Sequence, residues 1–357
     1  MKKFDPPKIN RQKEFTGTRS VRKGFELDTD ALQAYMEKNV EGFSGTIDVR
    51  QFKGGQSNPT YQISAGGKKY VLRRKPMGKL LKSAHAVDRE YKVITALART
   101  DVPVARTYAL CQDDAVIGSW FYIMENVEGR IYWTIPDTPI NERKDIFYAM
   151  NDTFARLHNV DYKAIGLEDF GKAGNFFNRQ ISIWTQQYRK SVDKKYPAME
   201  KLIEWLEDNI PENDDVSIVH GDYRLDNLVF HPTEPRVIAI LDWELSTLGH
   251  PLADFAYHCL PWYWPGGADS RGLKGLDHVA LNFPTEKEYI TRYFKQTGHT
   301  TVENWNYYIA FSLFRSAGIA FGIMGRVKDG TAVSEQAKMS GAFAEPLAEL
   351  GYEQTQK

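Results

Sequence analysis

Three polar side chains of the types that phosphoryl transfer requires fall close together near the middle of the chain. Asp222 ends the stretch Val-His-Gly-Asp, Asn227 follows five residues later, and Asp242 comes directly after the apolar run 237–241. In such a set one Asp orients the attacking hydroxyl and takes its proton, while the Asn and the second Asp hold Mg²⁺ against the phosphates. Oxygen ligands suit Mg²⁺. We therefore predict Asp222, Asn227 and Asp242 as catalytic residues, with Asn227 and Asp242 as metal ligands.

The whole series, His-Gly-Asp, then Asn227, then Asp-Trp-Glu at 242–244, resembles the protein-kinase pattern of His-Arg-Asp, Asn and Asp-Phe-Gly. This variant is similar to the aminoglycoside phosphotransferase and choline kinase branch of the kinase-like fold. It most resembles the phosphotransferase domains fused to, or encoded beside, acyl-CoA dehydrogenases. The resemblance covers nearly the whole chain. It implies ATP and Mg²⁺ as cofactors, an alcohol group as acceptor and a functional link to an acyl-CoA dehydrogenase.

The resemblance and the periodicity together predict an α+β, bilobal kinase-like fold. Residues 1–24 are expected to form a basic tail that becomes ordered on contact. Residues 25–126 are expected to form a small nucleotide-binding lobe with an antiparallel sheet, and residues 127–357 a larger, mainly helical catalytic and substrate-binding lobe. Helix-like spacing of apolar residues dominates the second lobe, whose last helix is predicted over 332–350.

A loop with paired glycines is the first candidate for contact with phosphate. Gly54 and Gly55, followed by Ser57, separate two stretches with strand-like alternation. Backbone N–H groups in such a loop approach phosphate closely, and Ser57 adds a hydroxyl donor. An ordinary tight turn is the alternative when the loop is taken alone.

The next strand and helix supply a candidate ion pair. In the predicted strand 69–74, Arg73 takes the place of the kinase Lys that holds the α- and β-phosphates, with a planar fork instead of a point charge. Arg74 should point to the opposite face as a solvated charge. Glu90 lies on the apolar stripe of a helix predicted over 83–99, and a buried carboxylate needs a partner. By the resemblance that partner is Arg73; a solvated Glu90 at the edge of the stripe is the alternative.

Further residues are assigned by the resemblance alone. The backbones of Glu125 and Val127 are expected to face the edge of the adenine, at the connection between the lobes. Asp254 is expected to accept hydrogen bonds from the backbone of the catalytic stretch, and His220 to brace that loop rather than act as an acid or base.

Only 11 residues lie between Asp242 and Asp254, too few for the activation segment that docks a peptide, so a small acceptor is favoured.

Aromatic and cationic residues in the C-terminal half are candidates for the acceptor site. Trp262, Tyr263 and Trp264 fall in a loop-rich region, where they either wall a ligand or fill the core of the lobe. Arg315 interrupts the apolar pattern of a long helix, and Arg326 follows near its end. Aromatics and cations suit an apolar chain that bears phosphates or a carboxylate, whereas a site for polycationic aminoglycosides should be lined by carboxylates.

These residues predict an ATP- and Mg²⁺-dependent kinase that phosphorylates a hydroxyl group of a hydroxyacyl-CoA or a similar anionic metabolite. Two alternatives remain. One is a kinase for aminoglycosides, other amino alcohols or sugars, and the other is a nucleotide-binding module without catalysis. Turnover of ATP with a hydroxylated acceptor distinguishes an enzyme from a binding module.

Composition and charge narrow the class of protein further. Lys plus Arg and Asp plus Glu each number 46, so no overall field attracts nucleic acid or a membrane surface. The apolar content of 42% is typical of a packed globular protein. We expect no nucleic-acid or membrane partner and no signal peptide. Cys111 and Cys259 predict reduced thiols in a cytoplasmic protein rather than a disulfide framework.

Overall fold

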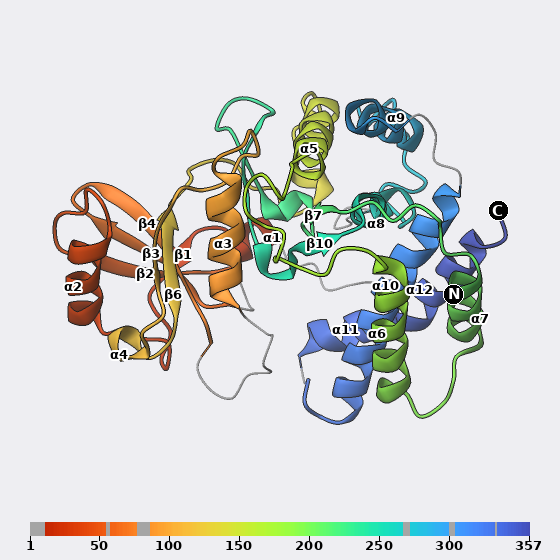
Figure 1. The fold of residues 1–357 in the computed structure, drawn as a ribbon, viewed down its shortest axis with the longest axis horizontal. Helices are drawn as coiled ribbons and strands as arrows, with labels where there is room; N and C mark the ends of the chain where they lie inside the picture. Colours follow the sequence, from red (N-terminus) through yellow and green to blue (C-terminus); the bar gives the residue numbers. More distant parts are fainter. Residues whose placement is uncertain (1–10, 55–57, 77–85, 267–271, 300–303, 333) are drawn as a thin grey trace.

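The computed structural model describes residues 11–54, 58–76, 86–266, 272–299, 304–332 and 334–357. These residues form two lobes that lie side by side: a sheet with three helices, and a larger lobe built mainly of helices (Figure 1). The predicted α+β, bilobal architecture is thereby confirmed. Gly55 and Ser57 of the predicted phosphate loop lie outside the described residues.

The small lobe is organised around one antiparallel sheet of six strands in the order β1-β2-β3-β4-β6-β5. Its strands are β1 (Thr18–Arg19), β2 (Asp48–Phe52), β3 (Thr60–Ala65), β4 (Lys68–Arg74), β5 (Thr107–Cys111) and β6 (Phe121–Glu125). Strand β1 pairs with β2 at the edge of the sheet, with Thr18 opposite Phe52. Part of the predicted N-terminal tail therefore belongs to the small lobe.

Helices cover the two faces of this sheet. Helices α2 (Thr29–Asn39) and α4 (Asp114–Ile117) lie on the face away from the large lobe, and α3 (Val87–Leu97) lies on the face toward it (Figure 1). The side chain of Asp28 caps α2 by accepting a hydrogen bond from the N–H of Ala31 at 3.0 Å. Strand β4 is buried from both sides, which explains why it can hold charged groups only where partners meet them.

Arg74 corrects one prediction from the sequence. It does point to the face opposite Arg73, but it is 2% exposed rather than solvated. The chain around α4 covers that face, so the guanidinium donates to the carbonyl of Ile117 at 3.4 Å and lies 5.8 Å from the ring centroid of Tyr61. The alternation in β4 gave the correct direction, but it could not reveal that a distant helix covers this face.

The large lobe surrounds one long buried helix. Its helices are α5 (Arg143–His158), α6 (Phe176–Ser191), α7 (Pro197–Asp208), α8 (Pro251–His258), α9 (Glu286–Thr297), α10 (Trp305–Lys328), α11 (Glu335–Ala342) and α12 (Ala344–Gln354). Helix α10 contacts α6, α7, α8, α11 and α12. Gly318, Gly322 and Gly325 follow one another along α10 and meet α6, where an added Cβ would come within 3.4 Å or less of an atom of α6. These glycines set the close approach of the two helices.

Helix α10 is long and apolar enough to cross a membrane by length and composition, but 78% of the relevant window is buried inside the protein. Core helices of folded domains pass the same test, and the contacts of α10 identify it as one of these. It is the only such helix in the described part of the chain.

The C-terminal helix predicted over 332–350 is two helices, α11 and α12, that meet at Phe343. Pro346 lies in the first turn of α12. Because proline lacks an N–H group and its ring collides with the carbonyl four residues earlier, a continuous helix through this point is disfavoured. The break therefore falls where the sequence has its proline.

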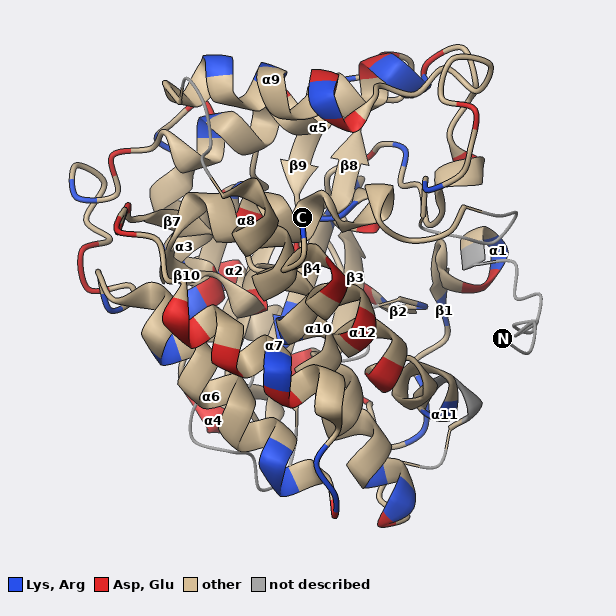
Figure 2. Cartoon of the chain, turned by 90° about the vertical axis from the view of Figure 1, so that its right-hand side faces the viewer, with Lys and Arg blue, Asp and Glu red and all other residues tan. Residues whose placement is uncertain are grey.

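Two short antiparallel pairs carry the catalytic stretch. Strand β7 (Ser217–Val219) pairs with β10 (Thr247–Gly249), and β8 (Leu228–Phe230) pairs with β9 (Val237–Ile240). The predicted hairpin is the inner pair. The outer pair brings the segment after Asp242 back beside the strand that leads into Asp222. On the surrounding helices positive and negative side chains are interspersed (Figure 2), as expected for equal numbers of each.

Candidate active site

The loop that carries Asp222 is fixed by a tight turn at Gly221 and by hydrogen bonds that its backbone N–H groups donate. Gly221 has φ +82°, and a Cβ there would lie 2.9 Å from the carbonyl oxygen of Leu245, so only glycine fits this turn. The carboxylate of Asp254 accepts from the N–H groups of His220, at 2.6 Å, and Gly221, at 3.0 Å. The predicted structural role of Asp254 is confirmed.

His220 also has the predicted bracing role. Its Nδ1 accepts from the N–H of Asp222 at 3.2 Å, and its Nε2 lies 2.8 Å from the carbonyl oxygen of Leu241, which can only accept. The ring is therefore neutral with its proton on Nε2. Because both nitrogens bond backbone, His220 ties the loop of Asp222 to the segment that precedes Asp242.

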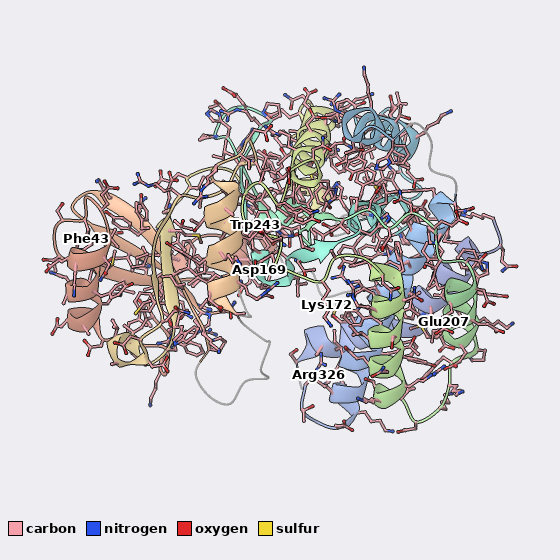
Figure 3. The ribbon with its side chains drawn as sticks, viewed as in Figure 1. Phe43, Asp169, Lys172, Glu207, Trp243 and Arg326 are labelled. Carbon is pink, nitrogen blue, oxygen red and sulfur yellow. The ribbon has the colours of Figure 1, made fainter. Side chains whose placement is uncertain are left out.

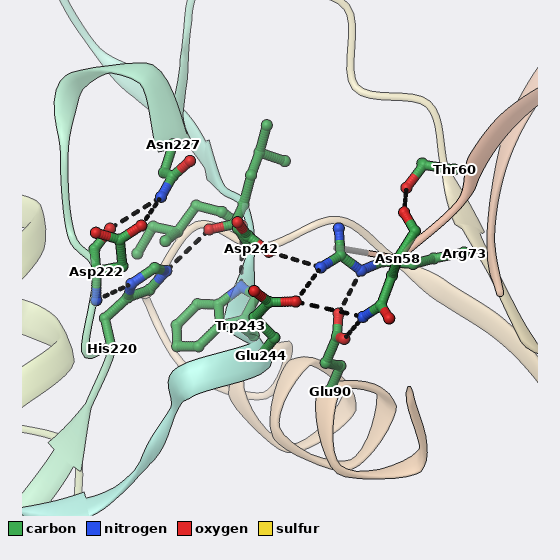
Figure 4. Close-up of polar contacts among 12 residues, drawn as sticks. Asn58, Thr60, Arg73, Glu90, His220, Asp222, Asn227, Asp242, Trp243 and Glu244 are labelled. Atoms are coloured by element: carbon green, nitrogen blue, oxygen red, sulfur yellow. Dashed lines mark hydrogen bonds and ion pairs between the residues drawn. The ribbon is translucent and has the colours of Figure 1, made fainter. Parts of the chain in front are cut away.

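Asp222 and Asn227 lie together at the end of this loop (Figure 4). The Nδ2 of Asn227 donates to the Asp222 carbonyl at 2.9 Å and to its carboxylate at 3.2 Å. Burial raises the pKa of the Asp222 carboxyl, and the guanidinium of Arg224, whose Nε lies 3.1 Å from Oδ1, opposes the rise. Arg224 was not predicted from the sequence, yet its charge favours the ionised form of the candidate base and its side chain lies against that carboxylate.

This geometry predicts how the reaction depends on pH. If Asp222 is the general base, its ionised form is active, so its raised pKa places the acid limb of kcat/KM at a higher pH than an ordinary Asp would. Replacing Arg224 by Met removes the charge that lowers this pKa, and the acid limb should move to still higher pH. Profiles of kcat/KM against pH for both proteins test this; an unmoved limb would contradict the assignment of Asp222.

Asp242 meets the small lobe through Arg73. The Nη2 of Arg73 lies 2.6 Å from Oδ1 of Asp242 and 3.3 Å from Oε2 of Glu244, and its Nε lies 2.7 Å from Oε2 of Glu90 (Figure 4). The predicted ion pair between Arg73 and Glu90 is therefore present. Asp242 adopts φ +65°, a left-handed conformation that Asp tolerates better than most residues. This backbone conformation lies where the chain turns from β9 toward Glu244.

The groups around Arg73 fit a bound cation. One guanidinium faces three carboxylates, those of Glu90, Asp242 and Glu244. Burial raises the pKa of Glu90 to about 7, Arg73 opposes the rise, and Asp242 and Glu244 add to it. The side chain of Asp242 is 33% exposed, and the amide oxygen of Asn227 is left for a metal because the nitrogen is engaged. This surplus of negative charge is what a site for Mg²⁺ requires.

The described residues contain no group of three His, Cys, Asp or Glu side chains that could hold a metal by themselves. A cation at Asn227 and Asp242 would therefore complete its shell with phosphate oxygens and water, which is the usual arrangement for Mg²⁺ bound together with a nucleotide. The donor set fits Mg²⁺ carried in by a nucleotide better than it fits a permanently bound metal.

Two residues of this cluster were missed in the sequence. Asn58 is fully buried and donates to Glu90 at 2.8 Å and to Glu244 at 3.4 Å, so it joins the small lobe to the large one. Glu244 supplies the third carboxylate at Arg73. The only signal for Glu244 was the Glu in Asp-Trp-Glu, where protein kinases have Gly. Asn58 gave no signal, since Asn before Pro59 is ordinary in a turn.

Arg73→Lys tests what the planar fork contributes. An ammonium group cannot reproduce the two separate contacts of Arg73 to Glu90 and Asp242, so we expect a loss of stability of about 1–3 kcal/mol and a severalfold higher KM for ATP. Thermal unfolding and ATP kinetics measure the two effects. Arg74→Lys is the matched control, because Arg74 sits on the far face of the same strand. It should lower stability but leave the KM for ATP unchanged.

The predicted hinge lies where the chain leaves the small lobe. Glu125 ends β6, and its N–H donates to the carbonyl of Arg106 at 2.8 Å. Val127 follows, and Arg130 pairs with Phe230 of the large lobe. The chain therefore passes from the sheet of the small lobe to the large lobe between Glu125 and Arg130, and contact of Glu125 and Val127 with adenine stays a prediction.

Gly54 has a packing role that the sequence did not indicate. A Cβ there would lie 3.0 Å from the indole of Trp133, which in turn packs against the ring of Phe15 in a tilted arrangement and donates to Thr16 at 3.0 Å. The start of the predicted phosphate loop is therefore held against the N-terminal segment. Contact of Gly54 with phosphate stays a prediction.

Two cavities border the catalytic loop. The first, here called the apolar cavity, has a volume of about 90 Å³. It is lined by Trp133, Thr134, Ile135, Phe147, Met150, Tyr223, Arg224, Leu225, Asp226, Tyr257, His258, Leu260, Pro261, Trp262 and Trp264. The second, the cationic cavity, has a volume of about 180 Å³. It is lined by Phe176, Gln180, Trp184, Val219, Gly221, Leu245, Thr247, Ala253, Asp254, Tyr257, Phe311, Ser312 and Arg315.

The predicted acceptor residues divide between these cavities. Trp262 and Trp264 line the apolar cavity, but Tyr263 lines neither and donates its hydroxyl to Glu286 at 2.6 Å. Arg315 lines the cationic cavity and donates to the carbonyl of Gly221 at 2.8 Å, beside Asp222. Arg326, labelled in Figure 3, is exposed and lines neither cavity. It lies 11 residues further along α10, about 16 Å away along the helix axis.

Known proteins are similar to this chain in sequence. Residues 48–289 match the model of the phosphotransferase enzyme family. Acyl-CoA dehydrogenase family member 10 of Mus musculus is 44% identical over 340 residues, which is 94% of this chain and 32% of that protein. Acyl-CoA dehydrogenase family member 11 of Homo sapiens is 41% identical over 91% of this chain and 43% of that protein. The chain thus spans less than half the length of these relatives.

Solved structures of other proteins show the same fold. A protein from Ralstonia eutropha, provisionally named an aminoglycoside phosphotransferase, is 53% identical, with a TM-score of 0.86 over 93% of this chain and 99% of its own. A choline kinase from Cryptosporidium parvum shares the fold at 14% identity, with a TM-score of 0.58 over 91% of this chain and its whole length. So does an aminoglycoside phosphotransferase solved with ADP and hygromycin B, with a TM-score of 0.58 over 90% of this chain and 97% of its own. The chain belongs to the phosphotransferase enzyme family, whose members transfer a phosphoryl group to a hydroxyl.

Proposed function

We propose that this phosphotransferase uses ATP with Mg²⁺ to phosphorylate a hydroxyl group of a hydroxyacyl-CoA or another anionic metabolite of that kind. The observation that carries the nature of the acceptor is Arg315, a fixed cation in the cavity next to Asp222. The nucleotide and the metal are supported by the cluster around Arg73, where carboxylates outnumber cations.

The chemistry assigns each residue a task. The carboxylate of Asp222 orients the acceptor hydroxyl and takes its proton as the oxygen bonds to the γ-phosphorus. The bond from that phosphorus to the bridging oxygen breaks, and ADP leaves with the electron pair. Arg73 would hold the phosphates, and Asn227 and Asp242 would hold the metal. Mg²⁺, when bound, neutralises charge on the phosphates and aligns them.

Arg315 is held in place by three kinds of contact. It donates to the carbonyl of Gly221, its guanidinium lies 4.7 Å from the ring centroid of Tyr257, and helix α10 fixes its backbone. A guanidinium has five N–H donors, so donors remain for a carbonyl, carboxylate or phosphate oxygen of the acceptor. A preset cation of this kind favours an acceptor that carries negative charge or a polarised carbonyl.

The carboxylates that line the two cavities are already engaged. Asp226, in the apolar cavity, lies 3.5 Å from Arg224, and Asp254, in the cationic cavity, binds the backbone of His220 and Gly221. For a polycationic acceptor these carboxylates are already engaged, and the positive charge of Arg315 would repel it. These contacts favour an anionic acceptor over an aminoglycoside or an amino alcohol.

The names of the relatives point in the same direction. Proteins named acyl-CoA dehydrogenases contain a region similar to nearly all of this chain, so an acyl-CoA is a natural common metabolite. We therefore propose a functional link between this phosphotransferase and an acyl-CoA dehydrogenase activity. The intact set of Asp222, Asn227 and Asp242 favours an enzyme over a nucleotide-binding module without catalysis.

The test is a side-by-side assay of ADP formation with hydroxyacyl-CoAs, kanamycin, choline and a sugar, each with and without EDTA. We expect Mg²⁺-dependent turnover fastest with a hydroxyacyl-CoA, and a phosphate monoester on its acyl chain detectable by mass spectrometry. Faster turnover of kanamycin would defeat the proposal. A thermal shift with ATP but no turnover of any acceptor would instead favour the binding module.

Replacing Arg315 by Gln should raise the KM of the anionic acceptor by about 10-fold or more, because a charge-assisted hydrogen bond is lost. The KM for ATP should not change. Arg189→Gln is the matched control, since Arg189 is an exposed cation on α6 that lines neither cavity. Arg326→Gln asks separately whether a long acceptor extends along α10. Equal effects of the Arg315 and Arg189 replacements on the acceptor KM would count against Arg315 as its ligand.

A further inference from the structure

The apolar cavity is walled mainly by apolar and aromatic side chains. Ile135, Met150, Leu225, Trp262 and Trp264 contribute apolar surface from four segments of the large lobe. The one carboxylate on its wall, Asp226, is engaged by Arg224. A cavity of this composition binds hydrocarbon rather than phosphate or sugar.

This cavity is joined to the catalytic loop at two points. Arg224 lines it, and the Nε of Arg224 lies 3.1 Å from the carboxylate of Asp222. Tyr257 lines both cavities, and the guanidinium of Arg315 lies 4.7 Å from the centroid of its ring. The residues on either side of Asp222 therefore border two cavities, Gly221 the one with a fixed cation and Tyr223 to Leu225 the one with apolar walls.

We propose that the apolar cavity receives the hydrocarbon end of the acceptor. The chain of the acceptor crosses Tyr257 with its hydroxyl at Asp222, its carbonyl or other polarised group toward Arg315, and its alkyl end among Ile135, Leu225 and Trp264. These side chains then select the acceptor by the length and branching of its alkyl chain beyond the hydroxyl. This inference rests on the proposed function, because it assigns the two ends of the same acceptor.

The inference predicts how strongly the KM of the acceptor depends on the length of its alkyl chain. Each methylene removed from water into an apolar site improves binding by about fourfold. The KM of the acceptor should therefore fall by about that factor for each carbon added beyond the hydroxyl, until the cavity is full, and should then level off or rise. If the alkyl chain lies in solvent instead, the KM should not depend on its length.

Trp264 allows a test of hydrocarbon against a polar alternative. Its indole Nε1 is buried, and no residue in the described ranges accepts a hydrogen bond from it. Trp264→Phe keeps an aromatic wall but removes this donor, whereas Trp264→Ala enlarges the cavity. If the ligand is hydrocarbon, the phenylalanine variant should keep the dependence on chain length. The alanine variant should shift the optimum toward longer chains.

The experiment measures the KM of wild-type enzyme for hydroxyacyl-CoAs of increasing alkyl length, and repeats the series with Trp264→Ala, Trp264→Phe and Ile135→Phe. Ile135→Phe fills the cavity from the opposite wall and should shift the optimum toward shorter chains, so the conclusion does not depend on one variant folding. Trp205→Ala is the control, because Trp205 is a partly buried tryptophan of the large lobe that lines neither cavity.

Binding of acyl-CoAs that lack the hydroxyl, followed by calorimetry, separates this inference from the proposed function. Tighter binding of longer chains in wild type, altered by the Ile135 and Trp264→Ala changes, supports it. A flat dependence on length, or one that these two variants leave untouched while hydroxyacyl-CoAs are still phosphorylated, overturns the inference alone. A dependence lost in Trp264→Phe also overturns it, because the cavity then reads a polar group. Absence of both turnover and binding with every acyl-CoA overturns both.

Discussion

Asp222→Asn is expected to lower kcat by about 10²–10⁴-fold and to leave the dissociation constant for Mg·ATP nearly unchanged. The amide keeps the shape of the side chain, and its oxygen can accept a hydrogen bond from Arg224 in place of the ion pair. It cannot, however, take the proton of the acceptor hydroxyl. The lost interaction belongs mainly to the transition state, so kcat should fall rather than KM rise. Initial rates and calorimetric titration with Mg·ATP measure the two quantities.

A matched control is available at the junction of the lobes. Asp169 is an exposed carboxylate that pairs with Lys92 across the two lobes. Asp169→Asn changes the same functional group without touching the catalytic loop, so it should retain wild-type kcat. Turnover near the wild-type rate in Asp222→Asn would remove Asp222 from the role of base.

Asp242→Asn should weaken binding of Mg·ATP by about 100-fold or more and abolish most turnover, because a carboxylate ligand that neutralises the metal supplies several kcal/mol. Affinity for ATP measured in EDTA should change far less. The stability of the metal-free protein should not fall, since Arg73 keeps Glu90 and Glu244 as partners when the charge of Asp242 is removed.

Glu244→Gln provides the comparison for this variant. It removes another of the three charges around Arg73 but leaves Asn227 and Asp242 in place. If Asp242 acts through the metal, its variant should depend on the Mg²⁺ concentration much more strongly than the Glu244 variant does. Equal affinity of wild type and Asp242→Asn for Mg·ATP, across a titration of Mg²⁺, would disprove the metal-ligand assignment.

The sequence could predict the parts of this site that depend on local spacing. The step from Asp222 to Asn227 and the apolar run before Asp242 marked the catalytic hairpin, and the burial of Glu90 followed from its place on a helical stripe. Arg73 could be assigned to a face of β4 because strands alternate. Each of these inferences needs only a few neighbouring residues.

The remaining contacts depend on segments that meet only in the folded chain. Asn58 reaches Glu244 across 186 positions, and the packing of Trp133 on Gly54 joins residues of different lobes. The burial of Arg74 required knowledge of where α4 lies. Such contacts leave no periodic trace in the sequence, so neither the network behind Arg73 nor the division of the acceptor region into two cavities could be predicted.

The pairing of β10 with β7 has a consequence for control of the enzyme. In protein kinases the segment after the metal-binding Asp is long, and its phosphorylation or release switches the site on and off. Here the same segment is held in strand β10, which begins three residues after Glu244, with Thr247 opposite Val219. A segment paired into a strand at this point is held in one conformation, unlike an activation segment that opens and closes a protein-kinase site.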